Sequence, residues 1–190
     1  MYLTNITDSE CEVIKKRLGA KIVNRKRKYG LRSIINAILY VTKTGIQWRM
    51  LPNDFPDWEL VYYYFRTWSK AGIDKTIHDS LVRQVRVDQC RNSSPSLGLI
   101  DSQSVKSSSM TKDKGIDGNK KVQGRKRFIL TDTLGLILGL YITTANEGER
   151  RGAIALLQKI KGIFPRLVKI LADQGFDGSR KYSTLFITFF

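Results

Sequence analysis

Asp101 and Asp173 each close a short apolar segment that is typical of a buried strand. The segments are Leu97–Asp101 (LGLID) and Leu167–Asp173 (LVKILAD). Ligands collect at the carboxyl ends of parallel strands in open α/β sheets, so two such strands would bring the carboxylates together. Carboxylates about 4 Å apart repel each other unless a divalent cation neutralises them, and such a cation supports phosphoryl transfer. Oxygen ligands suit Mg²⁺ or Mn²⁺.

The alternative is that both aspartates are ordinary strand-end or turn residues, and their spacing alone does not decide between the two interpretations. Asp132 is a further acid between them, but its place in the segment Asp132–Gly135 favours a hairpin-turn role. His78 is the only histidine and lacks a Ser or Cys partner pattern, so we expect it to be structural or surface-exposed.

The elements that would position the two aspartates can be read from residue 97 onward. Apolar runs predict strands at Leu97–Asp101, Lys126–Thr131, Leu136–Thr143 and Leu167–Asp173. A helix from about Glu147 to Gly162 is predicted between the last two, because Ala153, Leu156, Leu157 and Ile160 share one face. This order is that of the ribonuclease H-like fold, a mixed sheet flanked by helices, although other α/β folds share it.

The first ninety residues are predicted to be helical. A capping-box pattern, Thr7–Glu10, opens a first helix, and apolar residues at helical spacing predict three more. The polar segment Arg91–Ser96 indicates a boundary. The expected class is α+β: residues 1–92 form a small, helix-turn-helix-like DNA-binding domain, and residues 97–190 form a ribonuclease H-like domain that lacks its C-terminal part.

The composition favours a polyanionic partner. The 190 residues carry 33 Lys+Arg against 17 Asp+Glu, a formal net charge of +16. Cys11 and Cys90 are isolated, without a zinc-ligand pattern or signal peptide, so we expect a cytoplasmic protein. The most apolar stretch, Leu134–Tyr141, is too short to span a bilayer, which argues against a membrane protein.

Clusters of basic residues are candidates for contact with DNA phosphates. A solvated surface is the usual reading of such clusters, but few acids intervene here, which favours phosphate contact. The aromatic segment Trp58–Trp68 is interpreted as core for Val61, Tyr64, Phe65 and Trp68, leaving Tyr62, Tyr63, Arg66 and Lys70 to face DNA. The predicted DNA-binding residues are Arg25, Lys26, Arg27, Lys28, Arg32, Arg66, Lys120, Lys121, Arg125, Lys126 and Arg127.

Several blocks of sequence, in order, resemble bacterial insertion-sequence transposases of the DDE type. They cover nearly all of residues 3 to 178. The blocks are Asn36–Val41, Thr44–Pro52, Asp54–Pro56, Val61–Arg66, Ile100–Lys106, Gly124–Arg127, Thr131–Gly135 and Leu171–Gly178.

This resemblance implies that Asp101 and Asp173 are the first two acids of a catalytic triad that holds two Mg²⁺ ions. The ions would activate water, and then a DNA 3′-hydroxyl, for attack on phosphodiester bonds. Double-stranded DNA at the element ends and target would be the substrate, bound by a homo-oligomer in the bacterial nucleoid. The third acid, a Glu on a later helix, has no counterpart in this chain, and we expect a truncated or frameshifted product.

Three functions compete on this basis. The leading hypothesis is a transposase that cuts and joins the ends of its element, with this chain inactive alone. The second is a catalytically dead DNA-binding fragment that inhibits intact transposase. The third, a ribonuclease or repair nuclease, fits the acids but leaves the N-terminal blocks unexplained.

Overall fold

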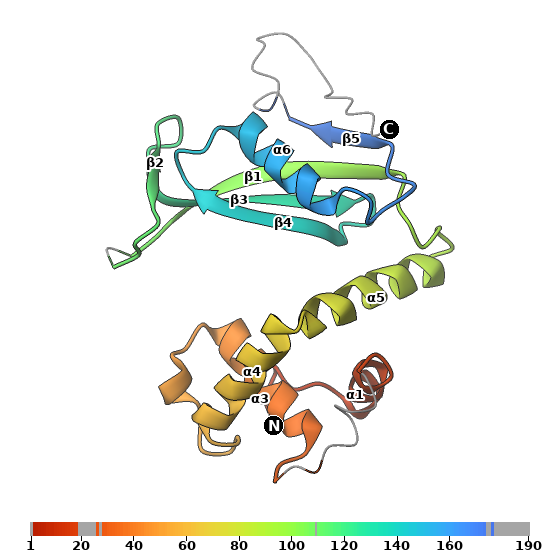
Figure 1. Ribbon diagram of the computed structural model, residues 1–190. Coiled ribbons are helices and arrows are strands. Elements are labelled where there is room, and N and C mark those ends of the chain that lie inside the picture. Colours follow the sequence, from red (N-terminus) through yellow and green to blue (C-terminus); the bar gives the residue numbers. More distant parts are fainter. Residues whose placement is uncertain (1, 19–25, 27, 109, 174–175, 177–190) are drawn as a thin grey trace. The chain divides into compact units, whose positions relative to one another are not determined.

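The computed structural model describes residues 2–18, 26, 28–108, 110–173 and 176, and it divides into two units, Met1–Leu81 and Val82–Phe190 (Figure 1). The division falls inside helix α5 (Ile73–Asp88), earlier than the boundary predicted at residues 91–96. The reason is that Val82 belongs to the hydrophobic core of the second unit. The assignment of residues 1–92 to DNA binding stays a prediction.

The first unit is helical, as the sequence predicts. Its described helices are α1 (Asp8–Lys15), α3 (Leu31–Thr44), the short 3₁₀ helix η1 (Trp48–Met50), α4 (Trp58–Lys70) and the first part of α5. The predicted capping box is confirmed, because the Thr7 hydroxyl accepts from the Glu10 N–H and the Glu10 carboxylate accepts from the Thr7 N–H. Helix α3 ends at Gly45, which takes the left-handed conformation that glycine favours.

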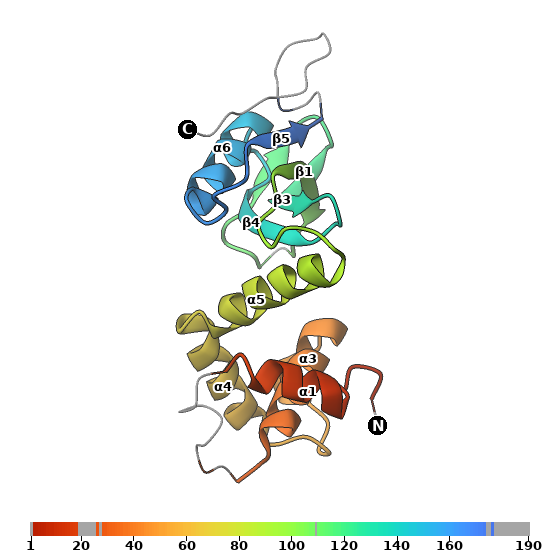
Figure 2. The ribbon, with the colours of Figure 1, turned by 90° about the vertical axis from the view of Figure 1, so that its right-hand side faces the viewer.

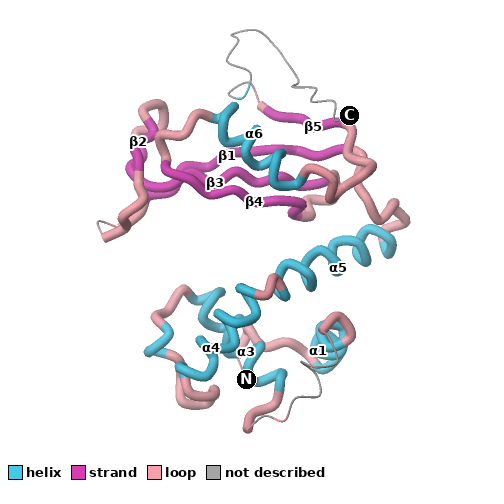
Figure 3. The backbone as a smooth tube through the Cα atoms, viewed as in Figure 1, coloured by secondary structure: helices cyan, strands magenta, loops and turns pink. Residues whose placement is uncertain are grey.

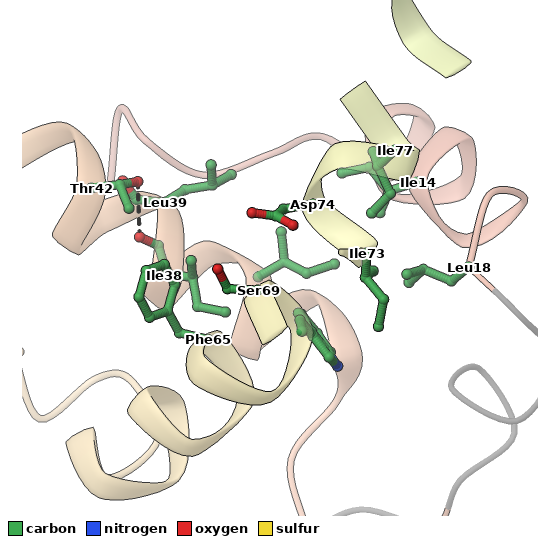
Figure 4. Close-up of a pocket in the computed structure, with 12 residues that line it drawn as sticks. Ile14, Leu18, Ile38, Leu39, Thr42, Phe65, Ser69, Ile73, Asp74 and Ile77 are labelled. Carbon is green, nitrogen blue, oxygen red and sulfur yellow. Dashed lines mark hydrogen bonds between the residues drawn. The ribbon is translucent and has the colours of Figure 1, made fainter. Parts of the chain in front are cut away.

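The core of this unit contains the residues that helical spacing assigned to it. In α4, Val61 and Tyr64 are buried, whereas Tyr62 and Tyr63 on the other side are exposed. An apolar cavity of about 340 Å³ lies among α1, α3, α4 and α5, with Phe65, Ile73 and Ile77 in its lining (Figure 4). No helix in the described part of the chain is long and apolar enough to cross a membrane.

The second unit contains a mixed five-stranded sheet (Figure 3). Strand β1 pairs antiparallel with β3 and parallel with β5, while β4 and β2 both pair antiparallel with β3. The predicted order of three strands, a helix and a last strand is confirmed. Strands β1 and β3 are longer than predicted, and β2 was not predicted. The strands are β1 (Leu97–Lys106), β2 (Gly115–Asp117), β3 (Val122–Asp132), β4 (Ile137–Thr144) and β5 (Lys169–Ala172).

Helix α6 (Glu149–Ile160) covers one face of the sheet, as Figures 1 and 2 show from two directions. Its buried face matches the predicted one: Ala153, Leu156, Leu157 and Ile160 pack into one core with residues of the sheet. The helix approaches β3 closely at Gly152, where an added Cβ would lie 2.0 Å from Cζ of Phe128. Only glycine fits at this contact.

The turn between β3 and β4 is held by a buried carboxylate. Asp132 accepts hydrogen bonds from the N–H groups of Leu134 and Leu136, both at 2.9 Å, which confirms the predicted turn role. Its other oxygen pairs with Arg86 of α5, and the side chains of the pair are 6% and 0% exposed. Helical spacing predicts that the apolar residues Ile77, Leu81 and Val85 share one face of α5. In the part that packs on the sheet, Val82 and Arg86 are buried instead, and Val85 is exposed.

A second buried ion pair fixes β2 against β3. The Lys126 ammonium lies 3.1 Å from the Asp117 carboxylate and donates to the carbonyl of Glu147 at 3.0 Å. Asp117 also accepts from the Ser104 hydroxyl and from the N–H of Lys120. The hydrogen bond from Ser104 is the main cause that holds the pKa of this carboxyl well below its usual value, and those from Lys120 and Lys126 add to it. Burial acts in the opposite direction and raises the pKa.

Replacing Arg86 by Met should destabilise the second unit strongly. The substitution leaves the Asp132 carboxylate buried without its cation, and breaking a buried pair in this way costs about 3–5 kcal/mol. Urea unfolding of the whole chain measures the effect. Arg83→Met, at an exposed position of the same helix, is the control and should change stability by less than about 0.5 kcal/mol. Similar losses in the two variants would contradict a stabilising role for the pair.

The Asp117 carboxylate should make stability depend on pH at the acidic end. Because its pKa is lower in the folded than in the unfolded chain, its contribution is present above pH 4 or so and is lost as the pH falls through the folded value. Urea unfolding between pH 6 and pH 2.5 should therefore show a smaller acid-induced loss for Asp117→Asn than for the unsubstituted chain. Asp113→Asn, at an exposed carboxyl of the same segment, is the matched control for the loss of a carboxylate. Identical profiles for Asp117→Asn and the parent would refute this role.

Candidate metal and DNA site

The pairing of β1 with β5 brings Asp101 and Asp173 to matching positions on neighbouring strands. The parallel register ends with Ile100 opposite Ala172, and each aspartate is the next residue of its chain segment. Neighbouring strands lie about 4.8 Å apart, so carboxylates at matching positions can share a cation. Both residues are exposed. Asp101 lies in the middle of β1, not at its end as predicted, because the strand continues to Lys106.

Asp101 belongs to the face of the sheet opposite α6. Residues alternate along β1, so that Ile100 and Ser102 are buried while Asp101 and Gln103 are exposed. The backbone N–H of Ser102 donates to Oδ1 of Asp101 at 2.7 Å. The assignment of Asp101 and Asp173 as catalytic and metal ligands stays a prediction.

A third acidic ligand is not found near this pair in the described residues, where no three His, Cys, Asp or Glu side chains are grouped to hold a metal ion. Asp132 is committed to Arg86 and its turn. Glu149 accepts from the Ser102 hydroxyl at 3.1 Å, which is on the α6 side of β1. Asp177 lies outside the described residues.

Most of the predicted DNA-binding cations in the described residues are exposed. These are Lys26, Lys28, Arg66, Lys120, Lys121, Arg125 and Arg127. Arg32 is instead half-buried: its guanidinium pairs with Asp8 and donates from Nε to the Ile6 carbonyl at 3.1 Å. Arg25 and Arg27 lie outside the described residues.

Lys126 differs from the expectation drawn from its sequence cluster. It is 5% exposed, since it occupies an inward position of β3 and its ammonium pairs with Asp117. A phosphate cannot reach it without breaking that pair. Lys126 therefore has a structural role and is not one of the DNA contacts.

Sequence reasoning missed three residues that organise the site. Gln103 accepts from Nε of Arg127 at 2.9 Å, Asp117 fixes the β2–β3 turn that carries Lys120 and Lys121, and Arg86 holds the β3–β4 turn. A pattern that could have revealed Gln103 is its two-residue spacing from Asp101, which assigns both to one face of a strand. Nothing in the local sequence marks the partners of Asp117 and Arg86.

Comparison with known proteins identifies two consecutive parts of the chain. A family model described as a putative transposase of the IS4/5 family matches residues 6–78, and one described as a transposase DDE domain matches residues 92–188, just over half of the chain. No curated protein and no solved structure matches it.

DDE domains have a ribonuclease H-like fold, act on DNA and generally use divalent metal ions. The element order and mixed sheet described above agree with that fold. With two transposase models matching consecutive parts of the sequence, the chain belongs to the insertion-sequence transposases of the DDE type.

Proposed function

We propose that this chain binds the ends of a mobile element and that Asp101 and Asp173 hold Mg²⁺ or Mn²⁺ for cleavage and transfer of DNA strands. The observation that carries the proposal is the parallel β1–β5 register, which continues directly into the two aspartates. Both aspartates are exposed, and Asp101 lies on the sheet face opposite α6, which leaves it accessible to a DNA strand.

The two carboxylates fit a hard divalent cation, because Mg²⁺ is usually bound by one or two carboxylates together with substrate phosphates. When bound, such ions activate a hydroxyl nucleophile and neutralise charge on the leaving oxygen. The protein's part is to fix the carboxylates. Strand pairing holds the backbone of Asp101, and the Ser102 N–H holds one of its carboxylate oxygens.

The DNA contacts in this proposal come from exposed cations of both units. Lys26, Lys28 and Arg66 belong to the first unit, and Lys120, Lys121, Arg125 and Arg127 belong to the second. Arg25 and Arg27 are included on sequence alone. Contacts of this kind position DNA without reading its sequence. Binding as a homo-oligomer on terminal repeats, in the bacterial nucleoid, completes the proposal.

A second role rests on the acidic ligands that the described residues provide. These residues group no third acid with Asp101 and Asp173. Two carboxylates hold a pair of metal ions loosely, in poor geometry for in-line attack. We propose, as the alternative, that a chain with only these two acids binds DNA without cutting it, and that in mixed oligomers it inhibits a transposase whose acidic triad is complete.

Binding of the chain to duplex DNA should be steeply salt-dependent. A chain that makes six phosphate contacts would bind about a thousandfold more weakly at 200 mM salt than at 50 mM, because each contact releases condensed counterions. Fluorescence anisotropy with a labelled 30-base-pair duplex measures this. The variant Lys26→Gln/Lys28→Gln should lower the salt slope, whereas Lys75→Gln should not, since Lys75 already pairs with Asp79. An affinity that is flat across the salt range would reject the proposed DNA binding.

On this alternative the purified chain should neither nick nor join DNA in Mg²⁺ or Mn²⁺, because its described residues group no third acid with the acidic pair. A supercoiled plasmid containing the element ends is the substrate, and gel electrophoresis reveals nicked, linear or joined products. Asp101→Asn is the control for contaminating nucleases. Metal-dependent cleavage by the chain that disappears in Asp101→Asn would show that a third ligand exists within these 190 residues.

A further inference from the structure

Arg127 shares the sheet face of the acidic pair. In the antiparallel β1–β3 ladder, Gln103 lies opposite Arg127 and Asp101 lies opposite Ile129. Directly paired residues project to the same face, so Arg127, Gln103 and Asp101 are on the side away from α6. Gln103 is two positions after Asp101 on the strand, so their Cα atoms are about 7 Å apart. The guanidinium is therefore within reach of a phosphate chain that passes the acidic pair.

The Arg127 side chain is oriented by a neutral partner. Its Nε donates to Oε1 of Gln103 at 2.9 Å, and its Nη2 donates to the same oxygen. A guanidinium has five N–H donors, so three remain for another acceptor. Gln103 restricts the plane of the guanidinium and leaves its positive charge uncancelled.

Three neighbouring cations of this region differ from Arg127 because they have acidic partners. Arg125, on the same strand and face, lies 3.6 Å from the Asp113 carboxylate and donates to the Asp113 carbonyl. Lys120 lies 3.9 Å from Glu149, and Lys126 is buried against Asp117. In the part of the chain that the structure describes, no carboxylate lies within ion-pair distance of Arg127.

We infer that Arg127, oriented by Gln103, binds the non-bridging oxygens of a DNA phosphate that passes beside Asp101. Arginine matches phosphate because its planar fork donates two parallel hydrogen bonds. Arg127 contacts the substrate in this arrangement, and Gln103 is a positioning residue that acts through it. The inference rests on the proposed function and adds the group that aligns the DNA backbone at the acidic pair.

The test is a salt titration of affinity for a 30-base-pair duplex, without metal, for the parent chain and three variants. Arg127→Gln should reduce the slope of log affinity against log salt by about one unit. Gln103→Glu should do the same, because it keeps the hydrogen bond but supplies a carboxylate that neutralises Arg127. Arg151→Gln, at an exposed position outside the proposed DNA contacts, is the matched control and should change the slope less, since Glu147 already offsets its charge.

A double-mutant cycle tests the location of the contact. Asp101→Asn removes a charge that repels DNA, and its effect on affinity should be coupled to that of Arg127→Gln by about threefold or more if both act on one stretch of backbone. The same cycle with Arg151→Gln should show weaker coupling. Circular dichroism and thermal unfolding verify folding, and Gln103→Glu remains as a second probe if Arg127→Gln does not fold.

The outcomes separate this inference from the proposed function. A parent chain that does not bind DNA, or binds it without salt dependence, would overturn the function and this inference with it. A parent chain that binds with a steep slope, together with parent-like slopes for both Arg127→Gln and Gln103→Glu, would overturn the inference alone. Equal slope changes for Arg127→Gln and Arg151→Gln, or additive effects in the Asp101 cycle, would also overturn it.

Discussion

The candidate site depends on one constraint, the parallel pairing of β5 with β1. Strand β5 follows α6, whose apolar face must be buried, and the sheet provides the surface that buries it. Gly152 permits the close approach of the helix to Phe128 of β3. Once α6 is packed, the returning chain pairs with the edge of β1. The alignment of two aspartates that are 72 positions apart follows from packing elsewhere, with no direct attraction between like charges.

The sequence predicts those elements whose apolar residues recur at a regular period. Helices α3, α4 and α6 and the β3–β4 turn belong to this group, since their partners are close in sequence or their pattern is strongly periodic. The continuation of β1 through Ser102, Gln103 and Ser104 is different. This segment has no apolar alternation, because one of its faces is exposed and the other packs through polar contacts with Glu149 and Asp117. Ladder pairing with β3 makes it a strand, and only the fold reveals that pairing.

The roles of the charged residues are even harder to predict from sequence alone. Sequence alone treats Lys126 and Arg127 as equivalent neighbours in a basic cluster, whereas strand alternation buries the first and exposes the second. A buried cation needs a partner, and the partners here are brought in by the fold. Asp132, for example, is 46 positions from Arg86. The formal charge of +16 therefore overstates what is available to DNA, because some cations serve the interior. The alignment of Asp101 with Asp173 was predictable from two strand-like segments and the order of elements. The role of Gln103 could be recognised only from the register of β1 against β3.

Helix α5 contributes to two hydrophobic cores, and this affects how the protein can be divided into fragments. Ile73 and Ile77 pack with the helical unit, whereas Val82 belongs to the core beneath the sheet and Arg86 neutralises a carboxylate there. A cut at the polar segment after Cys90 would leave Asp132 without its arginine, and a cut before α5 would remove two isoleucines from the helical core. Two complementary fragments would each expose side chains whose packing partners lie in the other fragment. Overlapping fragments that both contain residues 73–88 are the division that keeps each core whole.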